Sequence, residues 1–354
     1  MMLQIGARVV RRRRVNRTTV AGVEPAMRFL LLAAGLACGL VVGVPALPVS
    51  AVAGETCQGE AATIVGSPEV MTLPGTDGDD VIVTNGSWVI FAGDGNDRVC
   101  VTGNPGQVYA GFGDDVVDST AASSGRSFLG PGADTYLGGP GGDFVKAAGN
   151  PGSGAAIGDQ EVDVIDVGAG SATIYSGAPG KGNADTITVR DGKSTVYWSG
   201  HQTGGEVDFG AGQHSLKVSL GGDEQRDWRL GNAVDLGDAL VHWTGMVRDL
   251  SVLTFPESAA LTMVGTAAPE LLKARACRVV VEGRGGDDVL RLGFDPGDGC
   301  TTQERRLLGG AGADSLVGSR HGDVLFGGAG RDVANGRGGN DQCRAEVRRH
   351  CERR

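Results

Sequence analysis

Residues 309–344 read GGAGADSLV, GSRHGDVLF, GGAGRDVAN and GRGGNDQCR, which are four consecutive units of nine residues without an insertion. The sixth residue of every unit is an aspartate, and the eighth is apolar or cysteine. The aspartates are Asp314, Asp323, Asp332 and Asp341, and the eighth residues are Leu316, Leu325, Ala334 and Cys343. Glycines before each aspartate predict a tight turn, because glycine adopts positive φ without a steric penalty. Each unit therefore predicts a turn followed by a three-residue strand with one inward side chain.

The same frame fits the amino-terminal half of the chain with more variation. Its units are GTDGDDVIV (75–83), AGDGNDRVC (92–100), AGFGDDVVD (110–118), LGPGADTYL (129–137) and GGPGGDFVK (138–146), with Asp80, Asp97, Asp115, Asp134 and Asp143. Units without aspartate, such as VTGNPGQVY (101–109), lie between them. Two units therefore make one coil of about eighteen residues, so that alternate turns lie on the same side. A further unit, GRGGDDVLR (283–291), carries Asp288 and precedes the final tandem.

The composition agrees with a repeat fold. The chain has 62 glycines in 354 residues and only 5% aromatic residues, so one large conventional core is a poor fit. Collagen is excluded because the glycines cluster beside aspartate and do not recur at every third residue. Short runs of Val, Leu and Ile between the glycine clusters argue against disorder. The predicted fold class is all-β, a solenoid of nonapeptide repeats that is partly degenerate in the middle.

The first 53 residues have the pattern of a secretory signal peptide. A basic segment ending at Arg28 precedes an apolar run, Phe29 to Val44, and Ala51-Val52-Ala53 matches a cleavage site. Gly54 would be the first mature residue, and Met27 would make a compact start, so that residues 1–26 would be an over-long start. The alternative is an uncleaved membrane anchor. The prediction is a secreted, extracellular protein, possibly attached to the cell surface, with no membrane span after cleavage.

Charge and cysteines fit an exported, cation-binding chain. Residues 54–354 contain 25 Lys and Arg and 41 Asp and Glu, a net charge of −16. Such a chain repels nucleic acid and attracts cations. The six cysteines that remain predict disulfides between sequence neighbours, and the absence of a C-x-x-C pair argues against thiolate metal ligation. The predicted pairs are Cys57 with Cys100, Cys277 with Cys300, and Cys343 with Cys351.

GGAGADSLV and GGAGRDVAN resemble the GGxGxDxUx nonapeptide of hemolysin-type, or RTX, calcium-binding repeats. The opening of the mature chain, from Cys57 to the unit at 75–83, is similar to secreted bacterial calcium-binding proteins with such repeats. The resemblance covers residues 75–146 and 283–344. It implies a right-handed parallel β-roll that binds several Ca²⁺ ions between successive turns. Ser319, Arg320, His321 and Arg337 depart from the pattern, so that weaker sites are expected there.

The residue types suit calcium without reference to the family. Stacked coils lie about 4.8 Å apart, so equivalent aspartates approach each other and glycine carbonyls add oxygens toward the six to eight that calcium accepts. Magnesium suits such a site less well, because it demands a compact octahedron. The expected pairs are Asp314 with Asp332, Asp323 with Asp341, and Asp80, Asp97, Asp115 and Asp134 in series. The predicted metal-site residues are Asp80, Asp97, Asp115, Asp134, Asp143, Asp288, Gly310, Gly312, Asp314, Asp323, Gly328, Gly330, Asp332 and Asp341. The alternative is a set of Asx turns in a metal-free solenoid.

The chain divides by repeat quality. After residues 1–53, the expected parts are an amino-terminal calcium-binding β-roll (54–197), a degenerate segment (198–280), a second calcium-binding β-roll (281–344) and a basic tail or cap (345–354). The degenerate segment either continues the solenoid, which we prefer, or is an inserted β module. Trp198, Trp228 and Trp243 in this region suggest either sugar stacking or, as the preferred interpretation, core packing.

The predicted function is a secreted calcium-binding repeat protein with calcium-coupled folding and a structural or adhesive role. The sequence contains no H-E-x-x-H, G-x-S-x-G or P-loop motif, so we predict that it is not an enzyme. Two alternatives stay open: a surface adhesin that binds cell-wall or extracellular glycan, and a calcium-dependent polysaccharide lyase or hydrolase. The repeat specifies a metal and a shape, but neither a physiological partner nor an oligomeric state.

Overall fold

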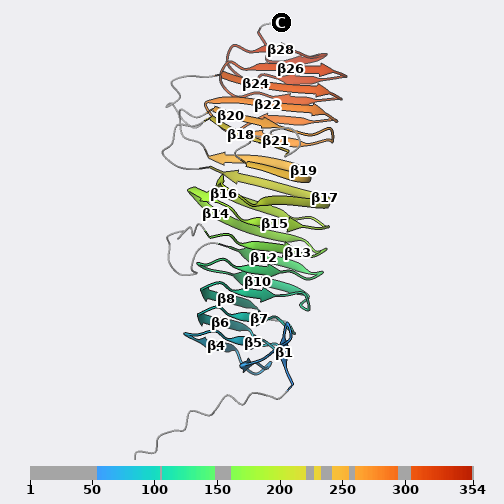
Figure 1. The fold of residues 1–354 in the computed structure, drawn as a ribbon. Coiled ribbons are helices and arrows are strands. Elements are labelled where there is room, and N and C mark those ends of the chain that lie inside the picture. Colours follow the sequence, from blue (N-terminus) through green and yellow to red (C-terminus); the bar gives the residue numbers. More distant parts are fainter. Residues whose placement is uncertain are drawn as a thin grey trace, which may run out of the picture. The chain divides into compact units, whose positions relative to one another are not determined.

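The computed structural model describes residues 54–103, 106–147, 161–220, 227–232, 241–254, 260–293 and 304–352. These residues form strands and turns, and none of them is helical (Figure 1). A small antiparallel pair, β1 (Thr56–Cys57) and β2 (Glu60–Ala61), precedes the repeats. All the other strands belong to two ladders of parallel strands, and the chain alternates between them.

One of the two ladders, named ladder one, contains the strands that follow the aspartate-bearing turns of the amino-terminal half and the strands that continue the same ladder later in the chain. Its members are β3 (Ile64–Val65), β5 (Val81–Val83), β7 (Arg98–Cys100), β9 (Val116–Asp118), β11 (Thr135–Leu137), β13 (Val164–Val167), β15 (Thr186–Val189), the first parts of β17 (Glu206–Ser219) and β19 (Val241–Thr254), β18 (Asp227–Asn232), β20 (Ala260–Val264), β22 (Arg278–Gly285), β24 (Glu304–Ala311), β26 (Val324–Ala329) and β28 (Gln342–Arg344).

Ladder two contains the strands between these. Its members are β4 (Thr72–Thr76), β6 (Val89–Asp94), β8 (Gln107–Phe112), β10 (Ser124–Phe128), β12 (Gly142–Lys146), β14 (Ala172–Asn183), β16 (Thr195–Gln202), the second parts of β17 and β19, β21 (Leu271–Ala274), β23 (Val289–Leu292), β25 (Ser315–Val317), β27 (Val333–Asn335) and β29 (Val347–Arg349).

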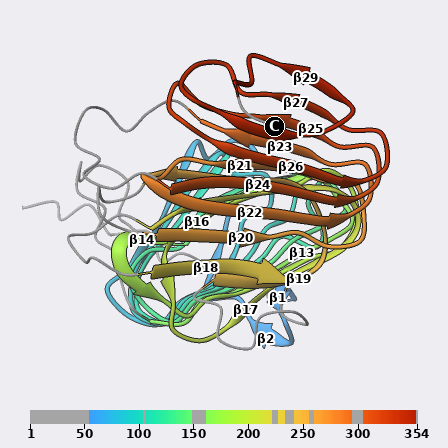
Figure 2. The same ribbon diagram turned by 90° about the horizontal axis from the view of Figure 1, so that it is seen from above.

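Neighbouring strands within a ladder come from successive coils. Val81 pairs with Arg98, and Arg98 pairs with Val116, which are steps of 17 and 18 residues along the chain. Every pairing among these strands is parallel, which requires the chain to return by a crossover after each strand. Figure 2 shows β22, β24 and β26 side by side, as their register requires. The fold is therefore the predicted all-β solenoid, with about 12 turns.

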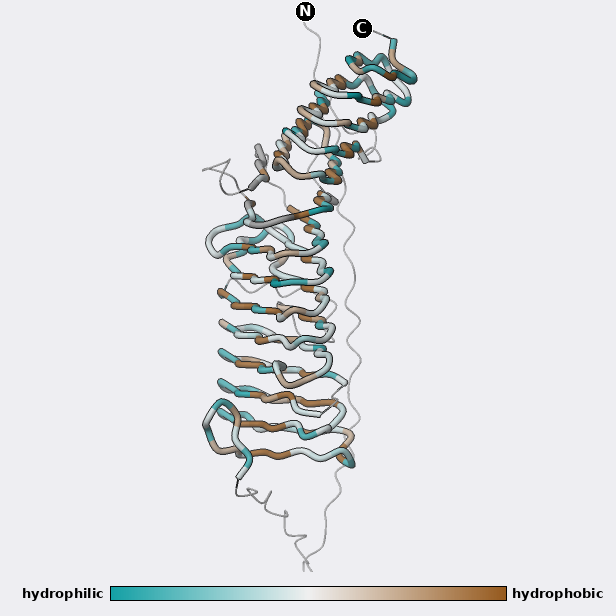
Figure 3. The backbone as a smooth tube through the Cα atoms, turned by 90° about the vertical axis from the view of Figure 1, so that its right-hand side faces the viewer, coloured by the Kyte–Doolittle hydropathy of each residue, from teal (hydrophilic) through white to brown (hydrophobic). Residues whose placement is uncertain are grey.

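The core is the column of inward side chains between the two ladders. Alternation along each strand places every second side chain inside, and Figure 3 shows brown apolar positions recurring coil after coil. Leu316, Leu325, Ala334 and Cys343, the predicted inward residues of the tandem, are all fully buried. A buried branched residue contributes about 1.5–3 kcal/mol relative to exposure, so each coil is stabilised mainly by its contacts with its neighbours.

The middle segment is less regular but uses the same ladders. The pairing of β17 with β19 contains register shifts between Phe209 and His214 and again near Ser219. Trp198 and Trp243 are fully buried, and the indole N–H of Trp198 donates to the carbonyl of Gly200. These two tryptophans pack in the core and are not available for sugar stacking. The side chain of Trp228 lies outside the described part.

Two of the three predicted disulfides are present. Cys57 bonds to Cys100, and Cys343 bonds to Cys351. The third predicted pair includes Cys300, which lies outside the described residues, as does the predicted signal peptide. In the part of the chain that the structure describes, no helix is long and apolar enough to cross a bilayer.

Candidate metal-binding site

Acidic residues form three rows, each at the point where a turn enters a strand. Row A precedes ladder-one strands and consists of Asp80, Asp97, Asp115, Asp134, Asp163 and Asp185. Row B precedes ladder-two strands and consists of Glu270, Asp288, Asp314 and Asp332. Row C precedes β26 and β28 and consists of Asp323 and Asp341. Every one of these side chains is buried.

Consecutive members of a row are joined by one repeated hydrogen bond. In row A the main-chain N–H of Asp80 donates to Oδ1 of Asp97 at 2.8 Å, and the same contact repeats along the row at up to 3.1 Å. Row B repeats it at 2.9–3.0 Å, and row C at 2.8 Å between Asp323 and Asp341. Every carboxylate after the first of its row thus accepts, through Oδ1, a hydrogen bond from the row member of the coil before it.

The second carboxylate oxygen points back into its own turn. A Cβ built on Gly309 would lie 2.3 Å from Oδ2 of Asp314, and one built on Gly327 would lie 2.1 Å from Oδ2 of Asp332. Among the described residues, six of these Oδ2 atoms are buried without a hydrogen-bond partner: those of Asp97, Asp115, Asp288, Asp314, Asp332 and Asp341. A buried anionic oxygen without a partner is costly, so the repetition indicates that a cation belongs there.

Backbone carbonyls supply further oxygens beside these carboxylates. Gly310, Gly312, Gly328 and Gly330 have φ values of 111–139°, which only glycine adopts without strain. A Cβ on Gly328 would lie 2.0 Å from the carbonyl oxygen of Gly310, and one on Gly330 would lie 1.8 Å from that of Gly312. Carbonyl oxygens of one turn therefore face the next turn of the row, and glycine is required because a side chain would collide with them.

The electrostatics of the rows also favour a bound cation. Burial raises the pKa of Asp115 and of Asp288 to about 7, with smaller contributions from neighbouring acidic residues. Burial likewise raises the pKa of Asp97 to about 6, and it raises the pKa values of Asp314 and Asp341. The ionised forms are disfavoured because they are desolvated and lie near like charges. A divalent cation would reverse that balance.

The structure brings together most of the predicted site residues. Asp314 follows Asp288 and precedes Asp332 in row B, and Asp323 is adjacent to Asp341. Asp80, Asp97, Asp115 and Asp134 stand in series, as expected. The metal-binding role of these residues stays a prediction, but their predicted proximity is correct.

Asp143 is the exception among the predicted site residues. It lies on ladder two, where its register neighbours are Gly125 and Ala172, and it accepts a hydrogen bond from the hydroxyl of Tyr136 at 3.0 Å. Burial raises its pKa. Asp143 therefore belongs to none of the three rows, and its carboxylate has a tyrosine partner in place of a neighbouring carboxylate.

Three members of the rows were not among the predicted ligands: Asp163, Asp185 and Glu270. All three directly precede a strand with alternating apolar residues, which is the signal that could have found them. Variation in coil length hid the signal, because Asp163 lies 29 residues after Asp134 and Asp185 lies 22 residues after Asp163. A search for acidic residues at a fixed spacing along the sequence misses such members.

The residues present fit a hard cation with oxygen ligands. Among the described residues, no three His, Cys, Asp or Glu side chains converge on one point, so carboxylates alone would not complete a coordination shell. One carboxylate oxygen per turn, with carbonyl oxygens of the adjacent turn, offers the mixed oxygen set that calcium accepts. These described turns contain no cysteine and a single histidine, His321, so their donor set disfavours zinc and copper.

Comparison with known proteins agrees with this geometry. Residues 307–343 match the family model of the RTX calcium-binding nonapeptide repeat, in four copies. A search among curated proteins gave no match to the chain. This part of the chain is therefore an RTX calcium-binding repeat region, and the protein is a calcium-binding repeat protein with a β-solenoid fold.

Proposed function

We propose that this chain is a secreted protein whose solenoid orders when several calcium ions bind between successive turns, and that its role outside the cell is structural or adhesive. The observation that carries the proposal is the buried Oδ2 atom without a hydrogen-bond partner, which recurs in rows A, B and C and faces a glycine of its own turn in rows B and C. Rows of desolvated carboxylates oppose folding, so the free energy of calcium binding would be free energy of folding. The net charge of −16 and the signal-like residues 1–53 support export.

A calcium titration followed by far-ultraviolet circular dichroism tests the proposal. The chain is expressed with residues 1–53 in place, and recovery from the medium with Gly54 as the first residue tests export. With its disulfides oxidised, the protein should gain β signal cooperatively with calcium, at about 10⁻⁴–10⁻³ M for an extracellular module. Magnesium at the same concentration should not replace calcium. A full β signal in excess chelator would contradict calcium-coupled folding.

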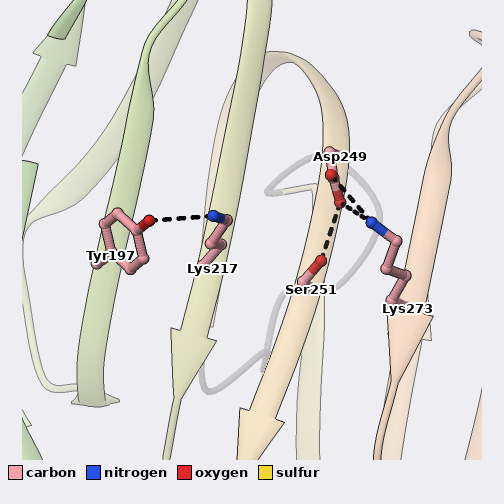
Figure 4. Close-up of polar contacts among 5 residues, drawn as sticks. All are labelled: Tyr197, Lys217, Asp249, Ser251 and Lys273. Carbon is pink, nitrogen blue, oxygen red and sulfur yellow. Dashed lines mark hydrogen bonds and ion pairs between the residues drawn. The ribbon is translucent and has the colours of Figure 1, made fainter. Parts of the chain in front are cut away.

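An aromatic ladder on the outer face of ladder two bears on the adhesin alternative. It consists of Phe91, Tyr109, Phe128, Phe144, Tyr175 and Tyr197, with neighbouring ring centroids 4.4–5.9 Å apart. At its end, the Lys217 ammonium contacts the Tyr197 hydroxyl at 3.1 Å, and Lys273 pairs with Asp249 further along (Figure 4). Because the rings stack on one another, their faces are not turned to solvent as sugar stacking requires. The ladder favours coil-to-coil stabilisation.

A hollow beside row C is the place where the enzyme alternative can be tested. It has a volume of about 380 Å³, and its lining includes Glu304, Arg306 and Phe326 together with Arg305. The Arg305 side chain is only 3% exposed, and its positive charge favours ionised Asp323. Incubation with acidic polysaccharides, with and without calcium, would detect a lyase by the ultraviolet absorbance of an unsaturated product. Arg306→Ala should abolish the signal if this hollow is responsible.

A further inference from the structure

The first turn of each row differs from the turns that follow it. Its second residue carries a hydroxyl group: Thr76 in the turn that ends at Asp80, Thr266 in the turn that ends at Glu270, and Ser319 in the turn that ends at Asp323. Where the structure describes the later turns of the same rows, this position holds glycine or a basic residue, for example Gly93, Arg337 and Lys181. Three independent rows thus begin with the same chemical feature.

In these first turns the hydroxyl residue binds the carboxylate of its own turn. The N–H and the Oγ1 of Thr76 both donate to Oδ2 of Asp80 at 2.8 Å. The N–H of Ser319 donates to Oδ2 of Asp323 at 2.5 Å, and its Oγ donates to the same oxygen at 3.0 Å.

The third first turn repeats the arrangement with glutamate in place of aspartate. The N–H of Thr266 lies 2.9 Å from both carboxylate oxygens of Glu270, and its hydroxyl donates to Oε1. The carboxylate oxygen that is buried without a partner in six later turns is therefore occupied by donors of the same turn in all three first turns. In the later turn that ends at Asp185, Oδ2 accepts a hydrogen bond at 2.6 Å from the hydroxyl of Ser176, which lies nine residues earlier.

The backbone separates the two kinds of turn as well. Gly93, Gly310 and Gly328 have φ values of 111–128° at the second position. Arg284 and Arg337 keep positive φ values of 73° and 70° there. Thr76, Thr266 and Ser319 are not among the described residues with positive φ. Departure from glycine alone does not change the turn, because arginine retains its geometry. The hydroxyl residues form a different turn whose amide faces the carboxylate.

A physical reason follows from the direction of the rows. Carbonyl oxygens of one turn face the next turn, as Gly310 faces Gly328, so each later turn receives oxygens from the turn before it. A first turn has no such glycine turn before it. The residue one coil earlier in register with Asp80 is Ala62, and the residue in register with Asp323 is Arg305. A cation site at a first turn would therefore lack the carbonyl oxygens that a preceding glycine turn supplies.

We propose that Thr76, Thr266 and Ser319 are metal-free end caps, in which a hydroxyl and an amide take the place that a calcium ion has in the later turns. The proposal rests on the proposed calcium-binding function. It assigns the first carboxylate of each row a structural role. It also predicts that calcium binds only between two consecutive glycine turns of a row. Asp80 and Asp323, both predicted ligands, then hold no ion through their own turn.

The test compares Ser319→Ala with Ser315→Ala in the full chain at saturating calcium. Ser315 lies four residues away on β25, and no hydrogen bond of its hydroxyl is found within the described residues. The number of bound calcium ions is counted by native mass spectrometry, and the thermal midpoint is measured in parallel. Ser319→Ala should keep every ion of the wild type but lower the midpoint by about 2–6 °C, because the hydroxyl donor to a buried carboxylate is lost while the N–H donor stays. Ser315→Ala should change neither quantity.

A variant in a second row and a conservative substitution distinguish loss of the cap from loss of a calcium ligand. Thr76→Ala should behave as Ser319→Ala does, and Ser319→Thr should restore the wild-type midpoint because the hydroxyl is retained. Loss of one calcium ion in Ser319→Ala or Thr76→Ala, with the wild type loaded, would show that the hydroxyl is a ligand and would overturn the caps. A wild type that takes up no calcium would instead overturn the proposed function itself.

Discussion

Substitution of Gly309 by alanine places a methyl group where the structure positions the candidate ligand atom. The new Cβ would lie 2.3 Å from Oδ2 of Asp314 and 2.4 Å from the carbonyl oxygen of Gly327. Ordinary contacts between these atom types are about 3.4 Å or longer, so both oxygens would have to retreat by about 1 Å, and overpacking of this kind costs about 1–3 kcal/mol. Both displaced atoms are oxygens on which a calcium ion would depend.

Gly285→Ala is the matched control for this change. Gly285 lies in the same row of turns and pairs in register with Ala311, so alanine already occurs naturally at its position in the next coil. A Cβ on Gly285 would meet nothing closer than 3.6 Å. Where the backbone accepts alanine, this replacement stabilises a protein by about 0.4–1 kcal/mol through the unfolded chain. The two variants therefore differ by about 1–4 kcal/mol, although both replace one glycine in row B.

The assay is a calcium titration with native mass spectrometry and thermal melting for the wild type and both variants. Gly309→Ala should bind fewer calcium ions and require more calcium to fold, whereas Gly285→Ala should match or exceed the wild type. Equal calcium stoichiometry and affinity in all three proteins would refute the reasoning, because a ligand at Oδ2 of Asp314 could not survive the displacement. Equal destabilisation by both variants would show that general glycine loss, and not the carboxylate, is responsible.

Three further predictions follow from the contacts and the charges. Burial raises the pKa of Asp115 and Asp288 to about 7, above the ordinary aspartate range. A raised carboxyl pKa destabilises the folded state at pH values above it, so in chelator the β signal should return as the pH falls from 8 to 5. Calcium affinity should fall over the same pH range, because the carboxylates become protonated. A signal in chelator that stays constant or grows with rising pH would contradict this. Tyr109→Ala removes two stacked ring contacts, each with centroids 4.9 Å apart, and should lower the free energy of unfolding by about 1–3 kcal/mol. Phe112→Ala is the control, because it removes an exposed ring that has no ring partner in the described part. Equal losses of stability in the two variants would exclude a stabilising aromatic ladder. Glu346→Ala leaves the N–H of Asp332 without the carboxylate that accepts it at 2.7 Å and should lower the thermal midpoint. Glu206→Ala, at an exposed position of β17, is the control and should leave the midpoint unchanged. Unfolding curves that coincide for the two variants would show that the Glu346 carboxylate does not stabilise the end of row B.

The sequence predicted what depends on local chemistry. Glycine turns that end in aspartate, followed by one inward residue, predicted the parallel solenoid and the inward column of Leu316, Leu325, Ala334 and Cys343. The tandem allowed the neighbours of Asp314 and Asp323 to be predicted, because nine residues make half a coil where no insertion occurs. Two of the disulfides predicted between cysteines that are neighbours in sequence order are also present.

The rest depends on the cumulative length of the coils, which no single repeat contains. Asp143 follows Asp134 by one nonapeptide, so it lies on the other ladder, where its register neighbours are Gly125 and Ala172 and neither is acidic.

In the carboxy-terminal part the same half-coil step places Asp323 in row C beside Asp341, because the tandem supplies aspartate in every unit. The same local motif thus places Asp323 in a row of acidic residues but leaves Asp143 isolated. An aspartate belongs to a row only if the coil before or after it also carries an acidic residue in register. Insertions, such as the one that makes the step before Asp163 29 residues long, hide this register from a search at a fixed spacing. A repeat can therefore be recognised from nine residues, but a metal site shared between turns can be located only when both coils are aligned.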